Sequence, residues 1–331
     1  MQREMLRAFS QSDVRGPVPA FRFRAATASE RSSREKAMST LMKLGLAAIA
    51  AAGVMTAQGP PAQNLTPHQL KPNVYWLEGG GGNTGVIVGN NGVIIIDAKT
   101  TPAQGKMVID EVAKITPKPI THVILTHSDG DHVNGLASFP TGLTIIAQEN
   151  NRKEQEAALK AGGRGAPPAD HLPTQLVTKE KETATLDGVK FEFYHWGPAH
   201  TSGDLIIYLP AEKIVFTGDV IAANRPDPII HPEKGGNTEG WVKTVQGIVK
   251  LNADQFVPGH GDIQTKADIE TRLKTTSDKR AKIVALVKEG KSLDEIKAAV
   301  GDTPPAALAG GGRGGPAFAS LSESVYNELK K

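Results

Sequence analysis

The spacing of apolar and polar positions divides the chain into two strand-rich segments, each followed by helices. In the first segment, short apolar runs separated by glycine or asparagine predict β-strands at 74–77, 86–88, 93–96 and 120–125. The sequence Asn90-Asn91-Gly92 lies between two of these runs and is typical of a β-hairpin turn. Apolar residues at helical spacing predict helices at 102–114 and 149–159.

The second segment has the same organisation. Its apolar runs predict strands at 184–186, 189–194, 205–209, 214–216 and 255–257. Amphipathic patterns predict helices at 238–251 and 266–287. A sheet must bury its apolar face against another layer, so we expect an α/β fold with two sheets packed face to face and helices outside.

The composition excludes several classes of protein. The 331 residues allow two domains or one large α/β unit, and 39% hydrophobic with 22% charged residues exclude wholesale disorder. No apolar run reaches the roughly 18–20 residues that a membrane-spanning helix needs, so we expect no stable membrane anchor. The chain has no cysteine, which excludes disulfides, thiol catalysis and thiolate metal ligands.

The net charge of +3 comes from the N-terminal part of the chain. Residues 1–43 carry nine basic and four acidic side chains, and the remaining residues carry 29 basic and 31 acidic side chains. A body with a net charge of −2 lacks the basic surface that nucleic acid requires. We therefore expect a small-molecule substrate and no nucleic-acid partner; the sequence does not indicate an oligomeric state.

The same N-terminal part has the features of an export signal. Residues 38–43 are short and basic, and an apolar stretch of 12 residues follows at 44–55. We interpret 38–59 as a signal peptide and 1–37 as a non-native or disordered extension, and we expect a periplasmic or secreted protein. The alternative is an ordinary disordered N-terminus that contains a chance alanine-rich helix.

Potential metal ligands directly follow the predicted buried strand at 120–125. Four of them lie within six residues, namely His127, Asp129, Asp131 and His132. Three further predicted strand ends each carry another candidate: His200, Asp219 and His260. Divalent zinc, iron and manganese accept imidazole and carboxylate ligands. Four strand ends that converge with these residue types are the arrangement that a two-metal hydrolytic site requires.

Taken together, these motifs resemble those of the metallo-β-lactamase-fold hydrolase superfamily over roughly residues 73–264. The first motif of that family has the form His-x-His-x-Asp-His, and Asp129 stands here in place of the second histidine. The positions that match are His127, Asp131, His132, His200, Asp219 and His260, with Asp97 as a supporting aspartate. The resemblance implies a four-layer αβ/βα sandwich, in which 60–331 form one hydrolase domain with a C-terminal helical extension.

The resemblance also implies a binuclear zinc centre, with iron or manganese as alternative metals. One metal would be bound by His127, Asp129 and His200, and the other by Asp131, His132 and His260, with Asp219 between them. Because aspartate replaces a histidine, two divalent ions, three carboxylates and one hydroxide would form a neutral core. Asp131 is the residue expected to handle the proton of the attacking water.

These features indicate a metal-dependent hydrolase whose metal-bound hydroxide attacks the carbonyl of a β-lactam, thioester, lactone or other ester. β-Lactamase activity stays open, because export favours an external substrate whereas the thiol ligand of one β-lactamase group is absent. Two alternatives remain. One is a mononuclear iron oxidoreductase that resembles persulfide dioxygenases, and the other is a metal-binding protein with little catalytic activity.

The remaining histidines are weaker candidates. His231 precedes a loop of two glycines and an asparagine, and we interpret it as a residue of the substrate pocket, with His171 as a weaker candidate for the same role. His122 and His195 are interpreted as core residues and His68 as a surface residue.

Overall fold

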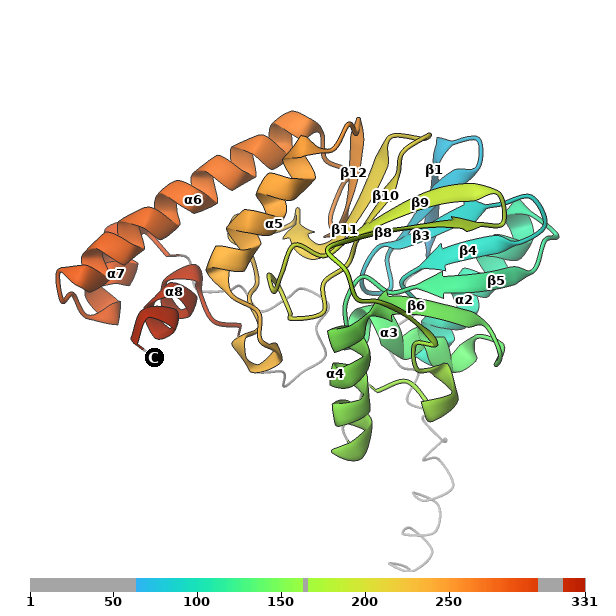
Figure 1. Cartoon of the computed structure of the whole chain (residues 1–331), viewed down its shortest axis with the longest axis horizontal. Helices are drawn as coiled ribbons and strands as arrows, with labels where there is room; N and C mark the ends of the chain where they lie inside the picture. The colour runs from blue at the N-terminus through green and yellow to red at the C-terminus, as the bar shows by residue number, and fades with distance from the viewer. Residues whose placement is uncertain (1–63, 163–165, 303–317, 331) are drawn as a thin grey trace, which may run out of the picture. The chain divides into compact units, whose positions relative to one another are not determined.

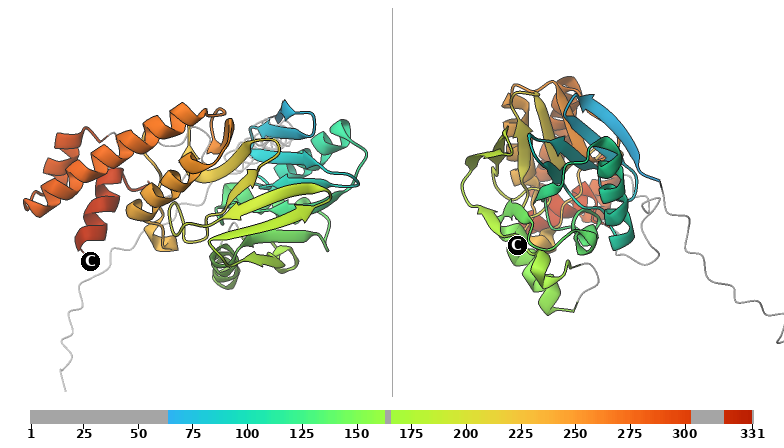
Figure 2. Two further views of the ribbon diagram at one scale, coloured as in Figure 1. Left: turned by 45° about the horizontal axis from the view of Figure 1, so that its top comes forward. Right: turned by 90° about the vertical axis from the view of Figure 1, so that its right-hand side faces the viewer.

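The computed structural model describes residues 64–162, 166–302 and 318–330. The predicted extension at 1–37 and the predicted signal peptide at 38–59 lie outside these ranges. Within them, no helix is both long enough and apolar enough to cross a membrane. The strands form two sheets, and helices lie against their outer faces (Figures 1 and 2).

The first sheet has seven strands in sequence order. They are β1 (Thr66–Lys71), β2 (Val74–Glu78), β3 (Thr84–Val88), β4 (Val93–Ile96), β5 (Ile120–Ile124), β6 (Thr144–Gln148) and β7 (Gln175–Val177). Neighbours are antiparallel from β1 to β4 and parallel from β4 to β7. Parallel strands end at the same edge of a sheet, so the segments that follow β4 and β5 lie side by side.

The second sheet has five strands. Their order is β12 (Gln255–His260), β11 (Ile214–Ala222), β10 (Ile206–Leu209), β9 (Val189–Tyr194) and β8 (Lys181–Leu186). β11 and β12 are parallel, and the other neighbours are antiparallel. All nine residues of β11 are buried, because this inner strand is covered on both faces.

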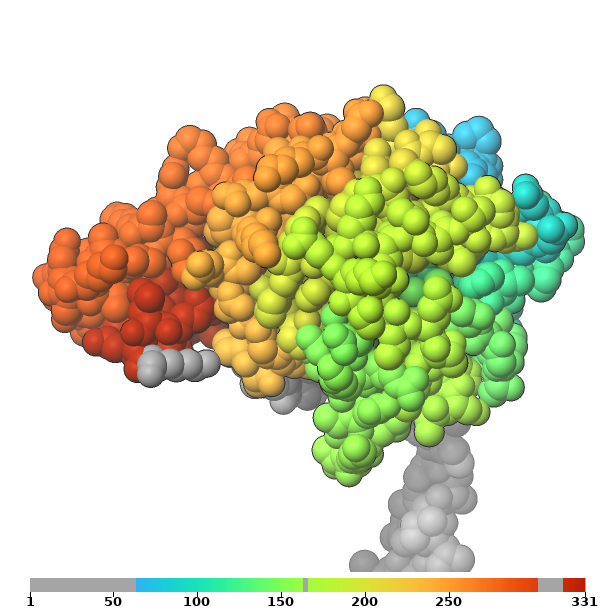
Figure 3. Space-filling view, in the orientation of Figure 1, coloured from blue at the N-terminus to red at the C-terminus, as the bar shows by residue number. Residues whose placement is uncertain are grey.

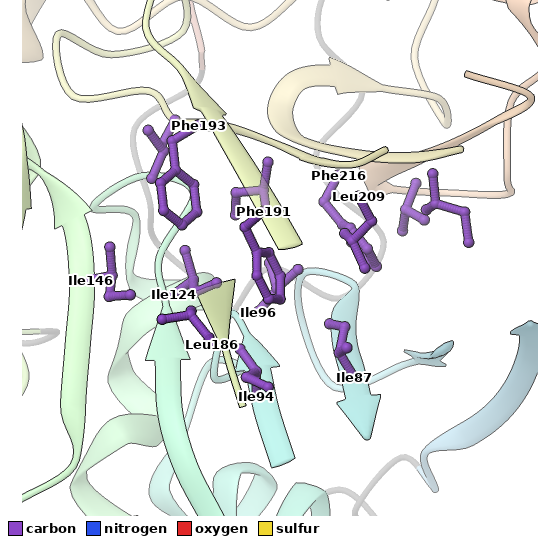
Figure 4. Packing of buried hydrophobic residues seen from close by; sticks show 14 of the residues in the cluster. Ile87, Ile94, Ile96, Ile124, Ile146, Leu186, Phe191, Phe193, Leu209 and Phe216 are labelled. Carbon is purple, nitrogen blue, oxygen red and sulfur yellow. The ribbon is translucent and has the colours of Figure 1, made fainter. Parts of the chain in front are cut away.

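The main hydrophobic core lies between the two sheets (Figure 4). Isoleucines from β3 to β6 face leucines and phenylalanines from β8 to β11. The residues labelled in Figure 4 are Ile87, Ile94, Ile96, Ile124, Ile146, Leu186, Phe191, Phe193, Leu209 and Phe216. Burial of one such side chain contributes about 1.5–3 kcal/mol to the free energy of unfolding. This shared core therefore holds the edges of the two sheets in a fixed relation.

Helices complete the outer layers. On the first sheet, α2 (Pro102–Ile115) packs through Val108 and Val112. On the second sheet, α5 (Thr238–Lys250) packs through Trp241 and Ile248. Helix, sheet, sheet and helix thus follow one another, which confirms the α/β fold and the αβ/βα sandwich predicted from the sequence.

A C-terminal group of helices extends from the second sheet. α6 (Lys266–Lys288) packs against α7 (Leu293–Val300) and α8 (Leu321–Lys330) around a small apolar cluster. Glu328 of α8 accepts a hydrogen bond of 2.7 Å from the backbone nitrogen of Thr238. The last helix is therefore attached to the first turn of α5.

Shorter elements and one polar helix complete the described chain. The single-turn elements are α3 (Gly130–Val133), η1 (Asn134–Ser138), η2 (Ala169–His171) and η3 (Pro232–Lys234). α4 (Glu149–Lys160) lies at the surface in the view of Figure 3. Its buried residues are the polar pair Asn151 and Gln155, which form a hydrogen bond of 2.5 Å.

Candidate metal centre

The loop after β5 supplies four of the candidate ligands. His127 lies three residues beyond the end of β5 and is 1% exposed. Asp129 is the N-terminal cap residue of α3, and Asp131 and His132 lie in the single turn of that helix. The tight turn separates the four side chains into two pairs, His127 with Asp129 and Asp131 with His132.

Residues of the second sheet lie beside both pairs. His200 lies in the loop between β9 and β10, and His260 is the last residue of β12. Asp219 lies inside β11, not at a strand end as the sequence predicted, because this strand continues to Ala222. The register of β11 with β12 shifts on both sides of Gly218, whose φ is +52°. A bulge re-aims the side chains around it, and this one directs Asp219 into the site.

The first group consists of His127, Asp129 and His200. Oδ2 of Asp129 lies 3.1 Å from Nε2 of His200 and 3.8 Å from Nε2 of His127. One potential ligand atom of each residue lies within 4.8 Å of the others. Two imidazoles and one carboxylate at this spacing are suited to one divalent ion.

The second group consists of Asp131, His132 and His260, and it meets the same 4.8 Å limit. Nε2 of His260 lies 3.0 Å from Oδ2 of Asp131, and Nε2 of His132 lies 3.8 Å from that oxygen. The two Nε2 atoms are 3.4 Å apart. This group therefore also presents two imidazoles and one carboxylate.

Asp219 lies between the two groups. Its Oδ1 is 3.2 Å from Nε2 of His132, and its Oδ2 is 3.4 Å from Nε2 of His260 and 4.0 Å from Nε2 of His200. A Cβ atom at position 259 would lie 1.9 Å from Oδ1 of Asp219, so Gly259 leaves the space that this carboxylate occupies. The position of Asp219 suits a carboxylate shared by two metal ions.

Three of the histidine rings are oriented by hydrogen-bond partners of their Nδ1 atoms. Nδ1 of His132 donates to Oδ2 of Asp97 at 2.8 Å, and Nδ1 of His200 donates to the carbonyl of Ile229 at 2.9 Å. The hydroxyl of Thr126 donates to Asp97 at 2.6 Å and lies 2.9 Å from Nδ1 of His127. These partners leave Nε2 facing the cluster, as is usual for histidines that bind metals.

His127 provides the test of whether these residues fit a metal ion. Its Nε2 is buried and has no hydrogen-bond partner among the described residues. Burial and the neighbouring His132 hold the pKa of His127 well below its usual value, so its ring is neutral. A neutral, buried and unpartnered Nε2 is a lone pair available to a metal, and the donor set therefore fits one.

The other histidines share protons with carboxylates when no metal is bound. Burial alone would lower the pKa of His200, but the hydrogen bond with Asp129 outweighs burial and raises this pKa to about 10. Burial also lowers the pKa of His260, but the negative charge of Asp219 outweighs it and raises this pKa to about 9. Metal binding would have to displace these protons.

His231 lies at the edge of the first group. Its Nε2 is 3.2 Å from Oδ2 of Asp129, and its ring centroid is 4.8 Å from that of His200. Lys234, three residues further on, donates a hydrogen bond from Nζ to Oδ1 of Asp129. His231 thus lies beside the first group, and its role in a substrate pocket stays a prediction. Lys234 is a neighbour that the sequence did not indicate.

The C-terminal segment also reaches this edge. The ring of Phe318 lies 5.3 Å from the ring of His231, edge to face, and the guanidinium of Arg225 lies 5.3 Å from the Phe318 centroid. Phe318 is far from the other site residues in sequence, and no motif marks it. The remaining four histidines lie outside both groups. His171 bonds the carbonyl of Phe139, His195 bonds that of Asp204, His122 lies 2.9 Å from the hydroxyl of Thr121, and His68 stacks on Trp76.

The comparison with protein families identifies the class of protein. The model of the metallo-β-lactamase superfamily matches residues 77–260, which is more than half of the chain and includes every residue of the two groups. The chain therefore belongs to the metallo-β-lactamase superfamily, which confirms the resemblance inferred from the motifs. The fold and the histidine–aspartate cluster together indicate that the protein binds metal.

Individual relatives are distant. The chain is 26% identical over 215 residues to the 2,4-dinitroanisole O-demethylase subunit alpha of Nocardioides sp. (strain JS1661), covering 63% of this chain and 62% of that subunit. It is 26% identical to the metallo-β-lactamase type 2 of Bacteroides fragilis, covering 61% of this chain and 81% of that enzyme.

A solved structure shows the same fold. The structure of a stereoselective inverting sec-alkylsulfatase from Pseudomonas sp. superposes with a TM-score of 0.60 at 20% identity, over 79% of this chain and 47% of the sulfatase. The chain therefore spans about half of that enzyme and less than two thirds of the demethylase subunit.

Proposed function

We propose that this protein is a binuclear zinc hydrolase. In the proposal His127, Asp129 and His200 bind one ion, Asp131, His132 and His260 bind the other, and Asp219 bridges the two. One observation carries it: four imidazole Nε2 atoms and three carboxylates face one another in two groups, and the bridging carboxylate lies 3.2–4.0 Å from Nε2 atoms of both.

The residues of the chain have distinct roles in this proposal. When bound, zinc lowers the pKa of a water molecule towards about 7 and polarises the substrate oxygen. Asp97 orients His132 directly and His127 through Thr126. Asp131 has a side chain that is 35% exposed, against 14% for Asp129 and 5% for Asp219, so it is the carboxylate best placed to take the proton of an attacking water.

The proposed substrate is a small molecule that carries an ester-like bond. Phe318 offers an apolar face beside His231, so we assign both residues to the substrate pocket. The candidate substrates are β-lactams, lactones, thioesters and other esters, and the names of the relatives add sulfate esters and aryl methyl ethers. The export signal predicted at 38–59 favours a substrate outside the cytoplasm.

Metal analysis and a substrate panel test the proposal. The protein is loaded with zinc, dialysed and assayed with a β-lactam, a lactone, a thioester, a phosphodiester, an alkyl sulfate and an aryl methyl ether. We expect two zinc equivalents per chain and turnover in at least one class. A fully loaded protein that turns over none of these substrates, or a protein that retains no metal, would overturn the proposal.

Two histidine variants provide the matched comparison. His260→Ala should lose one zinc equivalent and at least roughly 100-fold in kcat/KM, more than the 10–100-fold typical of changes behind a metal ligand. His68→Ala is the control. It removes a half-exposed histidine that stacks on Trp76 and belongs to neither group, so the variant should keep both zinc equivalents and full activity. Retention of two equivalents in His260→Ala would remove His260 from the metal site.

A mononuclear iron oxidoreductase is the second candidate. Each group contains two histidines and one carboxylate, the ligand set of many non-haem iron(II) sites. Protein purified without added metal distinguishes the candidates. One iron per chain with oxygen uptake in the presence of a persulfide favours the oxidoreductase, and two zinc equivalents without oxygen uptake favour the hydrolase.

A further inference from the structure

A lysine that the sequence motifs did not indicate contacts the first group. Nζ of Lys234 donates to Oδ1 of Asp129 and, at 3.2 Å, to the hydroxyl of Ser128. Its side chain is 29% exposed, and it is the last residue of the short helix η3. An ammonium group in hydrogen-bond contact with a proposed metal ligand requires a physical explanation, because it repels a divalent cation.

The backbone and its neighbours hold Lys234 in this place. Its nitrogen donates to the carbonyl of His231 at 3.0 Å, and its own carbonyl accepts from the nitrogen of Ser202 at 2.8 Å. The hydroxyls of Ser128 and Ser202 both donate to the carboxylate of Glu154. The contact between Lys234 and Asp129 therefore belongs to a connected network and is not a chance contact of a flexible side chain.

The two oxygens of Asp129 have different partners. Oδ1 accepts from Lys234, whereas Oδ2 faces His200 at 3.1 Å, His231 at 3.2 Å and His127 at 3.8 Å. Only Oδ2 thus lies among the imidazoles of the first group. A hydrogen bond to the far oxygen of a ligating carboxylate is a common way to fix its orientation.

The sum of charges at the site also links Asp129 with Lys234. With the hydroxide counted as in the sequence analysis, two divalent ions and the carboxylates of Asp129, Asp131 and Asp219 sum to zero, and the ammonium group of Lys234 beside them raises the sum to +1. A histidine at position 129, with a neutral residue at 234, would also give +1. The count for the ions and their ligands stays neutral, and Lys234 adds one positive charge next to it.

We propose that Asp129 and Lys234 are a matched pair that replaces the histidine found at this position elsewhere in the family. Asp129 supplies the ligand atom Oδ2, and Lys234 is a positioning residue that holds Oδ1 and restores the positive charge. This proposal rests on the proposed binding of metal by His127, Asp129 and His200. It predicts that the two positions are coupled, so that neither can be exchanged alone without changing metal binding.

A double-mutant cycle tests the pair through zinc affinity, without any need for a substrate. Asp129→His alone leaves an unpaired ammonium beside the metals, and should weaken the weaker zinc equivalent at least tenfold in competition with a chromophoric chelator. Adding Lys234→Met should restore the affinity to within about threefold of the wild-type value. Lys234→Met alone completes the cycle, and the coupling between the two changes should be at least tenfold.

Controls separate this proposal from the proposed function and from folding defects. Lys153→Met removes an exposed lysine of α4 that pairs with Glu149 at 2.9 Å, and it should not rescue Asp129→His. If Asp129→His does not fold, the isosteric Asp129→Asn replaces it in the same cycle. Wild-type protein that binds two zinc ions but shows a coupling within twofold of unity would overturn the pair. Wild-type protein that binds no zinc would instead overturn the proposed function.

Discussion

At the residue scale, two buried residues of the loop after β4, Asp97 and Lys99, support much of the site. Asp97 accepts from His132 and Thr126, and Lys99 donates from Nζ to the carbonyls of Leu77 and Gly82, both at 2.7 Å. Both residues have positive φ values, 61° and 73°, an uncommon conformation that is often retained near functional sites. Burial lowers the pKa of Lys99 to about 7, although Asp97 opposes the shift.

We therefore expect Lys99→Met to destabilise the fold. It would leave two buried carbonyls without a donor, at a cost of about 1–3 kcal/mol for each. Urea unfolding of the metal-free protein measures this loss. Lys106→Met, which removes an exposed ion pair with Asp110 on α2, is the control and should change the free energy of unfolding by at most about 0.5 kcal/mol. Equal small effects of the two substitutions would contradict a supporting role for Lys99.

The sequence indicated the candidate ligands and two of their neighbours, Asp97 and His231, but not Lys234 or Phe318, for a physical reason. Histidines and aspartates that follow strand-like runs are visible as a pattern, because metal chemistry restricts the residue type and the strand restricts the place. Lys234 and Phe318 have no such signature, since lysine in a polar turn and a lone phenylalanine are ordinary. Only the folded chain brings them to Asp129 and His231.

At the element scale, the missed strands share weak apolar patterns. β1 lies at an edge of the first sheet, and no residue of it is fully buried, so its sequence lacks the alternation that predicts a strand. β7 has three residues, and β6 contains a short run around Ile145 and Ile146. The continuation of β11 to Ala222 was missed because a bulge at Gly218 changes pairing without leaving a spacing signal.

The C-terminal helices also belong to this scale, because they carry Phe318 to the site. α8 is joined to α7 by an ion pair of 2.6 Å between Lys297 and Glu323, and to α5 through Glu328 and Thr238. Phe318, three residues before the start of α8, is therefore held beside His231. If His231 lines the substrate pocket as proposed, this attachment would place Phe318 at the same pocket.

We expect Phe318→Ala to raise KM roughly 3–10-fold for whichever substrate of the panel is turned over, with little change in kcat and no change in zinc content. The reason is the loss of an aromatic ring beside His231 without loss of a proposed metal ligand. Tyr326→Ala, which weakens the packing of α8 against α6 and α7, is the control. If Tyr326→Ala raises KM equally, the effect comes from loosening of the helices and not from the Phe318 ring.

At the scale of the whole molecule, the metal centre joins the two sheets. The first sheet and its following loop contribute His127, Asp129, Asp131 and His132, and the second sheet contributes His200, Asp219 and His260. Without metal, the histidines and carboxylates of the two sheets attract one another through hydrogen bonds and opposite charges. Metal ions that bind the folded chain would therefore link the two halves and stabilise the whole fold.

The size of this stabilisation should depend on pH. In the metal-free protein the pKa values of His200 and His260 are raised to about 10 and about 9, above the unfolded value of about 6.5. Groups with raised pKa values stabilise the fold fully below pH 6.5, and this contribution is lost as the pH rises through 9 and 10. Zinc competes with the same protons, so its affinity should rise over that range.

We therefore expect zinc to raise Tm more at pH 9 than at pH 6.5. A zinc concentration of 100 times the Kd at pH 9 would stabilise the fold there by about 2.7 kcal/mol, or roughly 5–10 °C in a domain of this size. The same concentration is a smaller multiple of the Kd at pH 6.5 and should stabilise the fold less. Thermal unfolding followed by circular dichroism, with chelator-treated and zinc-loaded samples at both pH values, measures the difference. His260→Ala should lose part of the gain at each pH, whereas His68→Ala should keep all of it. A zinc-induced shift in Tm that is equal at the two pH values would mean that the ion does not displace the protons shared by His200, His260 and the three carboxylates.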